Sequence, residues 1–367
     1  MLIKLIKYIG IHKLIFYFFS KYRNDKFDIN KCIKELETYC PNSKDTCIRK
    51  NDIKEESLSA SIIVPAYNVE KFIKQCICSL IAQNTVYKYE IIVINDGSTD
   101  KTLDIIKNIQ CDFLKVINKS NGGISSARNV GIENARGKYL IFCDADDFME
   151  ENALQNLISK AEDTGSDIVE GTYQYISEEG ILARKVRHPR KEANQTDTFG
   201  VPWCKCIKKS LFDNICFPES YWFEDSIIHQ IILPRANKIT WIDDIVYFYR
   251  KNSGGATSNA VGNPRSIESL WISIALFRDR KILGLKITKE YYIYMLKMMR
   301  LTYHRTKFLP EQIKKDIYYV YACFFADIFE GREEEYKFGY RDIDYTNIQR
   351  LVKNIDYKQY CKYFDRT

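Results

Sequence analysis

The sequence predicts an α/β fold: a doubly wound, mostly parallel sheet with a helical extension at each end of the chain. Between residues 61 and 143, short apolar runs of strand length alternate with segments of helical length. That alternation is typical of a parallel sheet in which a right-handed helical crossover joins successive strands. From Pro264 onward the pattern is helical and rich in Lys, Tyr and Phe, which predicts an α-helical C-terminal extension.

The regular alternation begins at Ser61. The strand candidates are nearly continuous apolar runs, as expected for strands that are buried on both faces of a sheet. The segment from Val69 to Ala82 places apolar residues three and four positions apart, which predicts a helix capped by Asn68. The expected strands are residues 61–65, 90–94, 113–117 and 139–143, and the expected helices are residues 69–82, 102–109 and 126–135.

The middle of the chain is less regular. We expect a helix from Asp147 to about residue 161, a short helix after Lys205, and a helix that Glu224 and Asp225 open. A strand-like stretch near residue 245 is interrupted by two adjacent aspartates. The remaining expectations are a strand at 167–171, a basic stretch at 184–191, a helix end at residue 233, a strand at 240–249 and a loop at 250–263.

Polar side chains follow three of the four regular strands. Tyr67 and Asn68 come after the first strand, Asp96 after the second, and Asp144 and Asp146 after the fourth. The carboxyl ends of parallel strands lie at one edge of a sheet, and ligands of open α/β sheets bind at that edge. The sequence therefore predicts a nucleotide-type site where these side chains converge.

The aspartates Asp144, Asp146 and Asp147 end an apolar strand abruptly. Unpaired carboxylates cannot lie in the core, so we expect them at the edge of the sheet. Carboxylate oxygens suit Mg²⁺ or Mn²⁺, and such an ion usually accompanies a diphosphate. The alternative is that Asp146 and Asp147 cap the next helix.

Composition limits the possible functions. The length of 367 residues suits one large domain with an appended piece or two modest domains. The net charge of +7 is mild and is no nucleic-acid signature. We expect a basic, apolar extension and linker at 1–58 with one helix at 29–39, an α/β domain at 59–258 and a helical region at 259–367.

Residues 1–23 are apolar and basic. Their longest apolar run, Leu14–Phe19, is shorter than the roughly 20 residues that span a bilayer, and no cleavage site for a signal peptide follows. The segment is interpreted either as an anchor on the cytoplasmic leaflet or as a helix that packs on the protein. The 12 cysteines are scattered, with one in a strand, which predicts reduced thiols in a cytosolic protein.

Residues 61 to about 258 resemble the family 2 glycosyltransferases, and five motifs in the same order carry the resemblance. Asn95 is one departure, because the family often has Asp there. The motifs are Ser-Ile-Ile-Val-Pro-Ala-Tyr-Asn at 61–68, Asn-Asp-Gly-Ser-Thr-Asp at 95–100, Asn-Gly-Gly at 121–123 with Ala127-Arg128-Asn129-x-Gly131, Asp144-Ala145-Asp146-Asp147, and Glu224-Asp225.

The resemblance implies an inverting, metal-dependent transfer of sugar from a UDP-sugar to a hydroxyl of a glycan or lipid-linked acceptor. It implies bacterial surface polysaccharide synthesis and Mn²⁺ or Mg²⁺ as cofactor. The thiols predict a place in the cytoplasm, and the anchor interpretation of residues 1–23 would put the protein at the inner face of the plasma membrane. Asp96 would bind uracil and Asp225 would be the general base.

The resemblance also assigns residues to roles. The implied sites are Glu224 and Asp225 for catalysis, Asp144 and Asp146 for the metal, Pro65, Ala66, Tyr67, Asn68, Asp96, Gly123, Arg128, Asp144 and Ala145 for the donor nucleotide, and Trp203, Lys205, Arg250 and Ser253 for acceptor or phosphate.

A purely structural role is possible for several of these residues. Tyr67 could be a core aromatic, Arg128 a solvated surface residue, and Glu224-Asp225 a pair of acids at a helix N-terminus. Among functions, a nucleotidyltransferase shares the sheet and the carboxylates but usually has a Gly-rich phosphate loop, which residues 65–68 lack. Two further hypotheses are a non-catalytic sugar-nucleotide-binding module and an interaction protein with a decayed site.

Overall fold

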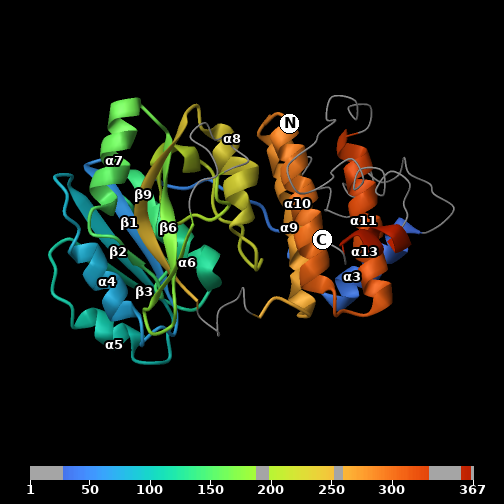
Figure 1. The fold of residues 1–367 in the computed structure, drawn as a ribbon, viewed down its shortest axis with the longest axis horizontal. Coiled ribbons are helices and arrows are strands. Elements are labelled where there is room, and N and C mark those ends of the chain that lie inside the picture. The colour runs from blue at the N-terminus through green and yellow to red at the C-terminus, as the bar shows by residue number, and fades with distance from the viewer. Residues whose placement is uncertain (1–27, 187–197, 252–258, 330–356, 365–367) are drawn as a thin grey trace.

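The computed structural model describes residues 28–186, 198–251, 259–329 and 357–364. In Figure 1 the strands gather in a twisted sheet on one side of the molecule, and long helices from the C-terminal part of the chain lie on the other. The segment 1–23 and Ser253 lie outside the described residues, as does most of the basic stretch at 184–191.

Four parallel strands form the regular half of the sheet, in the order β3-β2-β1-β4. Ile62 at its centre faces Ile91 on one side and Ile141 on the other. The four strands that the sequence predicts between residues 61 and 143 are confirmed, with ends that differ by a few residues. They are β1 (Leu58–Ala66), β2 (Tyr89–Asp96), β3 (Leu114–Lys119) and β4 (Gly137–Phe142).

The other half of the sheet is mixed. β8 runs antiparallel between β4 and β6, and β9 pairs with β6 in parallel. The α/β class is therefore confirmed, with antiparallel strands added at one side. The strands are β5 (Phe148–Met149), β6 (Ile168–Ile176), β7 (Leu182–Val186), β8 (Lys205–Lys208) and β9 (Ile239–Arg250).

Helices cover both faces of the sheet, as a doubly wound fold requires. Ile62 belongs to the cluster that α4 and α7 bury, and Ile63 belongs to the cluster that contains α6. Gly131 allows α6 to approach β1, since a Cβ there would come within 2.3 Å of Ile63. The helices are α4 (Ile73–Ile81), α5 (Thr102–Lys107), α6 (Gly123–Asn134) and α7 (Ala153–Thr164).

Some helix boundaries differ from the sequence prediction. Asn68 does not cap a helix: its φ of +51° places it in a left-handed turn, and α4 begins only at Ile73 with Phe72 as its N-cap. β5 delays the start of α7 to Ala153. The helix expected directly after Lys205 is preceded by β8, and only a 3₁₀ turn follows at Lys209–Phe212.

The interruption expected at Asp243-Asp244 is absent, because β9 runs through it. The register between β6 and β9 shifts there instead, which is how a bulge accommodates extra residues. The helix expected after Glu224-Asp225 is present. Its middle is a π-helix at Ile228–Ile232, and it ends as α8 (Leu233–Arg235).

The C-terminal extension is helical in the part that the structure describes. Its elements are the 3₁₀ helix η4 (Pro264–Ile267), α9 (Glu268–Ile282), α10 (Lys289–Thr306), α11 (Glu311–Phe329) and α13 (Tyr357–Phe364). None of the described helices has both the length and the apolarity to cross a membrane.

The first helix of the described residues, α3 (Ile29–Tyr39), has the bounds that the sequence predicts. It packs against α11, and in Figure 1 it lies among the C-terminal helices. The backbone that follows is fixed to α9, because the Trp271 indole donates to the Cys40 carbonyl and Asp279 accepts from the Cys47 amide. The first described residues and the helical region therefore share one core.

Candidate active site

Arg128 joins two acidic segments that lie far apart in the sequence. It lies on α6 and is buried, and its two terminal nitrogens reach different carboxylates. One nitrogen lies 2.6 Å from Oε1 of Glu224, and the other lies 2.9 Å from Oδ1 of Asp144. The structure thus brings the Asp144 segment and the Glu224-Asp225 pair together at the edge of the sheet.

The environment of the Glu224-Asp225 pair shifts its ionisation. Burial raises the pKa of Glu224 to about 7, although the charge of Arg128 opposes that rise. Burial also raises the pKa of Asp225, while the charges of Arg305 and Arg128 oppose it. A carboxylate with a raised pKa is a stronger base, and such shifts are common at catalytic sites.

The chain after β4 is held in place by Tyr247 of β9. The Tyr247 hydroxyl accepts from the Asp144 amide at 3.0 Å and donates to Oδ2 of Asp147 at 2.7 Å. The other oxygen of Asp147 accepts the Arg250 amide at 2.7 Å. Asp147 is therefore buried and bonded to β9, whereas Asp144 and Asp146 remain partly exposed.

These two carboxylates fit a divalent cation of the Mg²⁺ or Mn²⁺ type. Asp144 accepts from Arg128 through Oδ1 alone, so its second oxygen can serve a ligand. The described residues contain no cluster of three or more metal-binding side chains. Mg²⁺ is commonly held by one or two carboxylates together with water and substrate phosphate, so a pair of aspartates suffices.

Asp96, the predicted uracil contact, ends β2 and is buried at the start of α6. Its oxygens accept from the Gly122 and Gly123 amides at 3.0 and 2.8 Å. Lys119 also binds this carboxylate, at 2.6 Å. Asp96 therefore satisfies amides at the N-terminus of a helix, which is a site suited to negative charge.

The other predicted donor residues lie at the end of β1. Pro65 and Ala66 are buried in the strand, whereas Tyr67 is 49% exposed, which argues against a core role for its ring. Asn68 binds the next loop, since its side-chain oxygen accepts from the Thr99 amide at 2.8 Å. Gly123 is exposed, and Ala145 is buried between the two predicted metal ligands.

Three of the residues suggested for acceptor or phosphate lie in the described part of the chain, and each has partners inside the protein. Lys205 is fully buried and paired with Glu170. Trp203 is buried and stacks on Tyr247, with ring centres 4.7 Å apart. The Arg250 guanidinium donates to the Asp146 carbonyl at 2.8 Å, and also to Glu178 and Gln75.

No sequence pattern indicates two of the residues near this site. Tyr247 lies in a strand where aromatic residues are ordinary, and only its pairing with Asp147 gives it significance. Arg305 comes from α10, yet its charge opposes the rise in the pKa of Asp225 more than that of Arg128 does. No motif could have indicated Arg305, because the resemblance ends near residue 258.

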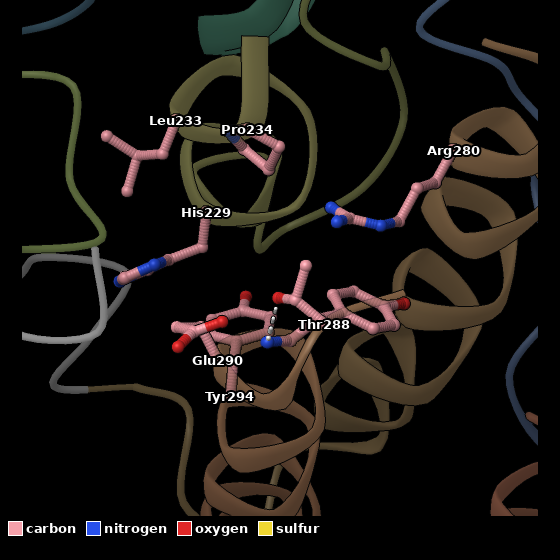
Figure 2. Close-up of a pocket in the computed structure, with 8 residues that line it drawn as sticks. His229, Leu233, Pro234, Arg280, Thr288, Glu290 and Tyr294 are labelled. Atoms are coloured by element: carbon pink, nitrogen blue, oxygen red, sulfur yellow. Dashed lines mark hydrogen bonds between the residues drawn. The ribbon is translucent and has the colours of Figure 1, made fainter. Parts of the chain in front are cut away.

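A small cleft lies between the helix that follows Asp225, α9 and the start of α10. Figure 2 shows His229 and Arg280 on opposite sides of this cleft, with Thr288 and Tyr294 from the start of α10 below them. Burial and the nearby Lys205 and Lys297 lower the pKa of His229 to about 3. His229 is therefore neutral near pH 7.

Comparison with known proteins identifies the family. The model of glycosyl transferase family 2 matches residues 61–217. EpsJ of Bacillus subtilis, an uncharacterized glycosyltransferase, is 36% identical over 54% of this chain and 62% of its own length. The glycosyltransferase GlyG of Streptococcus pneumoniae is 30% identical over 53% of this chain and 71% of its own length. The chain belongs to the family 2 glycosyltransferases.

A solved structure shares the fold of this family 2 chain. TarS of Staphylococcus aureus, residues 1–349 with UDP-GlcNAc, superimposes with a TM-score of 0.51 at 20% identity. The superposition covers 78% of this chain and 95% of that structure, so it includes part of the helical region. The matched segment of this chain spans less than two thirds of EpsJ.

Proposed function

We propose that this chain is a metal-dependent, inverting glycosyltransferase that moves a sugar from a UDP-sugar to a hydroxyl of a glycan or lipid-linked acceptor. The observation that carries the proposal is the bridge of Arg128 between Asp144 and Glu224. This bridge fixes the distance between the segment suited to a diphosphate and the segment suited to a base. Family membership supports transfer of a sugar rather than of a nucleotide.

The proposed donor site follows the ends of β1, β2 and β4. The exposed ring of Tyr67 is free to stack on a base. Asp96 would accept the imide proton of uracil, in addition to the amides that it already binds. TarS, which has the same fold, was solved with UDP-GlcNAc, and this supports a UDP-sugar as donor.

Asp144 and Asp146 would hold Mg²⁺ or Mn²⁺. When bound, such an ion offsets the negative charge that develops on the leaving diphosphate. Tyr247 and Arg250 keep this loop in one position through Asp147 and the Asp146 carbonyl. The protein itself therefore contributes a fixed loop geometry before any ligand arrives.

Asp225 is the proposed general base. It would take the proton of the acceptor hydroxyl while that oxygen forms a bond to the anomeric carbon from the face opposite the diphosphate. The bond between the anomeric carbon and the diphosphate oxygen breaks at the same time, and UDP leaves with the electron pair. Glu224, bonded to Arg128, would position Asp225 without touching substrate.

The proposal also includes the class of acceptor and the subcellular location of the reaction. TarS is named a poly(ribitol-phosphate) beta-N-acetylglucosaminyltransferase, and this name supports a role for the present chain in the synthesis of a bacterial surface polymer. A UDP-sugar donor would place the reaction in the cytoplasm, at the inner face of the plasma membrane if the acceptor is lipid-linked. Residues 1–23 would then meet the membrane surface.

A donor-hydrolysis screen tests the proposed function. The full chain is incubated with UDP-, GDP- and dTDP-sugars, with and without Mg²⁺ or Mn²⁺, and released nucleoside diphosphate is measured. We expect turnover of at least one UDP-sugar that EDTA abolishes. Turnover of only GDP- or dTDP-sugars would contradict the assignment of Asp96, and undiminished turnover in EDTA would contradict the metal role of Asp144 and Asp146.

A further inference from the structure

Arg305 reaches the proposed active site from the helical region. It lies in the last turn of α10, and its guanidinium carbon lies 3.7 Å from the ring centre of Phe223. Phe223 precedes Asp225 by two residues, on the segment that carries the proposed base. The Arg305 carbonyl also accepts the Gly262 amide at 2.8 Å, which fixes the end of α10 to the chain that follows β9.

The hydrogen-bonding capacity of this guanidinium is not fully used by the described residues. Nη1 of Arg305 is buried and has no hydrogen-bond partner among the described residues. The nitrogens of Arg128 that meet carboxylates are already bonded to Glu224 and Asp144. A buried donor without a partner costs free energy, so its retention beside a binding site suggests a partner that arrives with a ligand.

The groups whose charge or polarity acts on Asp225 come from several elements of the fold. They are Arg128 from α6, Asp144 after β4, and Arg305 and Tyr294 from α10, with Glu224 beside it in the chain. The three carboxylates here would repel an anionic substrate. Arg305 is the cation in this group that no carboxylate of the described residues binds directly.

The side of the sugar on which Arg305 lies follows from the proposed chemistry. In an inverting transfer the base stands on the face opposite the leaving diphosphate. A cation beside Asp225 is therefore on the side of the acceptor. Guanidinium groups bind phosphate and carboxylate oxygens through paired N–H donors, which makes Arg the common residue for recognising these anions.

We propose that Arg305 is an acceptor-binding residue, and that the acceptor carries an anionic group beside the hydroxyl that receives the sugar. This inference rests on the proposed function. It adds a residue from outside the segment that matches the family, and it names the chemical class of the acceptor. The helical region then completes the active site instead of only supporting the sheet.

Matched pairs of small acceptors test this. Glycerol 3-phosphate is compared with glycerol as acceptor, and glucuronate is compared with glucose. The donor in each assay is a UDP-sugar that the wild type hydrolyses. Sugar transfer and inhibition of water hydrolysis are both measured for the wild type, Arg305→Met, Arg305→Gln and Arg305→Lys. Lys307→Met is the control, because Lys307 is an exposed cation two residues further along the chain. Thermal melting confirms that each variant is folded.

We expect the wild type to favour the anionic member of at least one pair by roughly ten- to hundredfold, the worth of a charge-assisted hydrogen bond. Arg305→Met and Arg305→Gln should lose this preference, Arg305→Lys should keep part of it, and Lys307→Met should keep all of it. If no probe accepts the sugar, the anionic probe should still inhibit hydrolysis less in Arg305→Met than in the wild type. A preference within the glycerol pair would identify the anionic group of the acceptor as a phosphate, and a preference within the glucose pair would identify it as a carboxylate.

Three results would overturn the inference. The preference for the anionic acceptor and the inhibition of hydrolysis by the anionic probe could be the same in the wild type and in Arg305→Met. Arg305 would then have no role in binding the acceptor. Water hydrolysis could fall in Arg305→Met, which would show that Arg305 acts on Asp225. Arg305→Met could bind UDP more weakly than the wild type while it binds uridine equally well, which would show that Arg305 contacts the diphosphate. If the wild type hydrolyses no UDP-sugar, the proposed function fails first, and this inference fails with it.

Discussion

Arg128 and Glu224 lie 96 positions apart in the chain, and their side chains meet at 2.6 Å inside the protein. Arg128 comes from the helix after β3, and Glu224 lies before the helix that ends as α8. The same guanidinium holds Asp144. One buried side chain therefore fixes the two halves of the proposed active site to each other.

Replacing Asp225 by Asn tests the proposed base. The amide keeps the shape of the side chain but cannot take a proton, so we expect transfer and hydrolysis to fall by about 10²- to 10⁴-fold. The dissociation constant of UDP, measured by calorimetry, should change little. Asp213→Asn removes an exposed carboxylate on the same part of the chain and should leave both values unchanged. A variant that transfers at the parent rate would remove Asp225 from the mechanism.

Replacing Arg128 by Met should destabilise the fold. Asp144 and Glu224 would lose a buried counter-charge, and breaking a buried ion pair typically costs about 3–5 kcal/mol. Urea unfolding of the full chain measures the change. Lys138→Met is the matched control: the side chains of its ion pair with Glu162 are 38% and 40% exposed, so a loss below about 1 kcal/mol is expected. Equal losses in the two variants would contradict the structural role of Arg128.

Replacing Tyr247 by Phe tests how the predicted metal ligands are positioned. The change removes the hydroxyl that joins the Asp144 amide to Asp147 and keeps the stacked ring. Loss of such supporting contacts commonly weakens metal affinity about 10- to 100-fold. Mn²⁺ binding is followed by electron paramagnetic resonance in the presence of UDP. Tyr89→Phe deletes a hydroxyl that donates to the Leu80 carbonyl, and should leave Mn²⁺ affinity unchanged.

His229 should make the protein sensitive to acid. Its pKa falls from the usual 6.5 to about 3 on burial, so between these values the unfolded chain binds a proton that the folded chain does not. Stability from this residue is fully present above pH 6.5 and is lost as the pH falls toward 3, with a slope of up to about 1.4 kcal/mol per pH unit. Unfolding free energies at pH 7.5 to 4.5 should depend less on pH in His229→Gln than in the wild type.

The control for this titration is Leu233→Ala, which disturbs packing in the cleft that His229 lines and removes no titratable group. Its pH dependence should match that of the wild type. Because the comparison uses slopes and not absolute stabilities, a packing defect in either variant does not affect the result. Parallel pH curves for the wild type and His229→Gln would contradict the burial of a neutral imidazole.

The regular half of the fold could be predicted from local patterns. Apolar runs and helical spacing indicate the strands and helices from Ser61 to Cys143, and parallel topology then places Asp96 and Asp144 at one edge. The antiparallel β8 was missed because it is short and looks like the start of a helix. Lys205 of this strand has no local sign of burial, since its partner Glu170 lies in the neighbouring strand.

The candidate site could be predicted only where a motif covers it. The acidic groups lie in short, recognisable motifs, whereas Arg250, Tyr247 and Arg305 act through contacts that cross more than one element of the fold. Arg250 was named as an acceptor or phosphate contact, but the sequence did not indicate that its guanidinium reaches Gln75, which lies 175 positions earlier in the chain. Sequence spacing carries no information about such pairs.

The packing of α3 on the last helices has a consequence for synthesis of the protein. The amide of Cys47 finds its partner on Asp279, 232 positions later. At about 5–20 residues per second, a ribosome would need roughly 10 to 50 s to produce that partner. During this interval the strands of the sheet can pair, while the apolar face of α3, with Ile33 and Leu36, stays uncovered. Among the described helices, α3 is thus the first to be synthesised and one of the last to be buried.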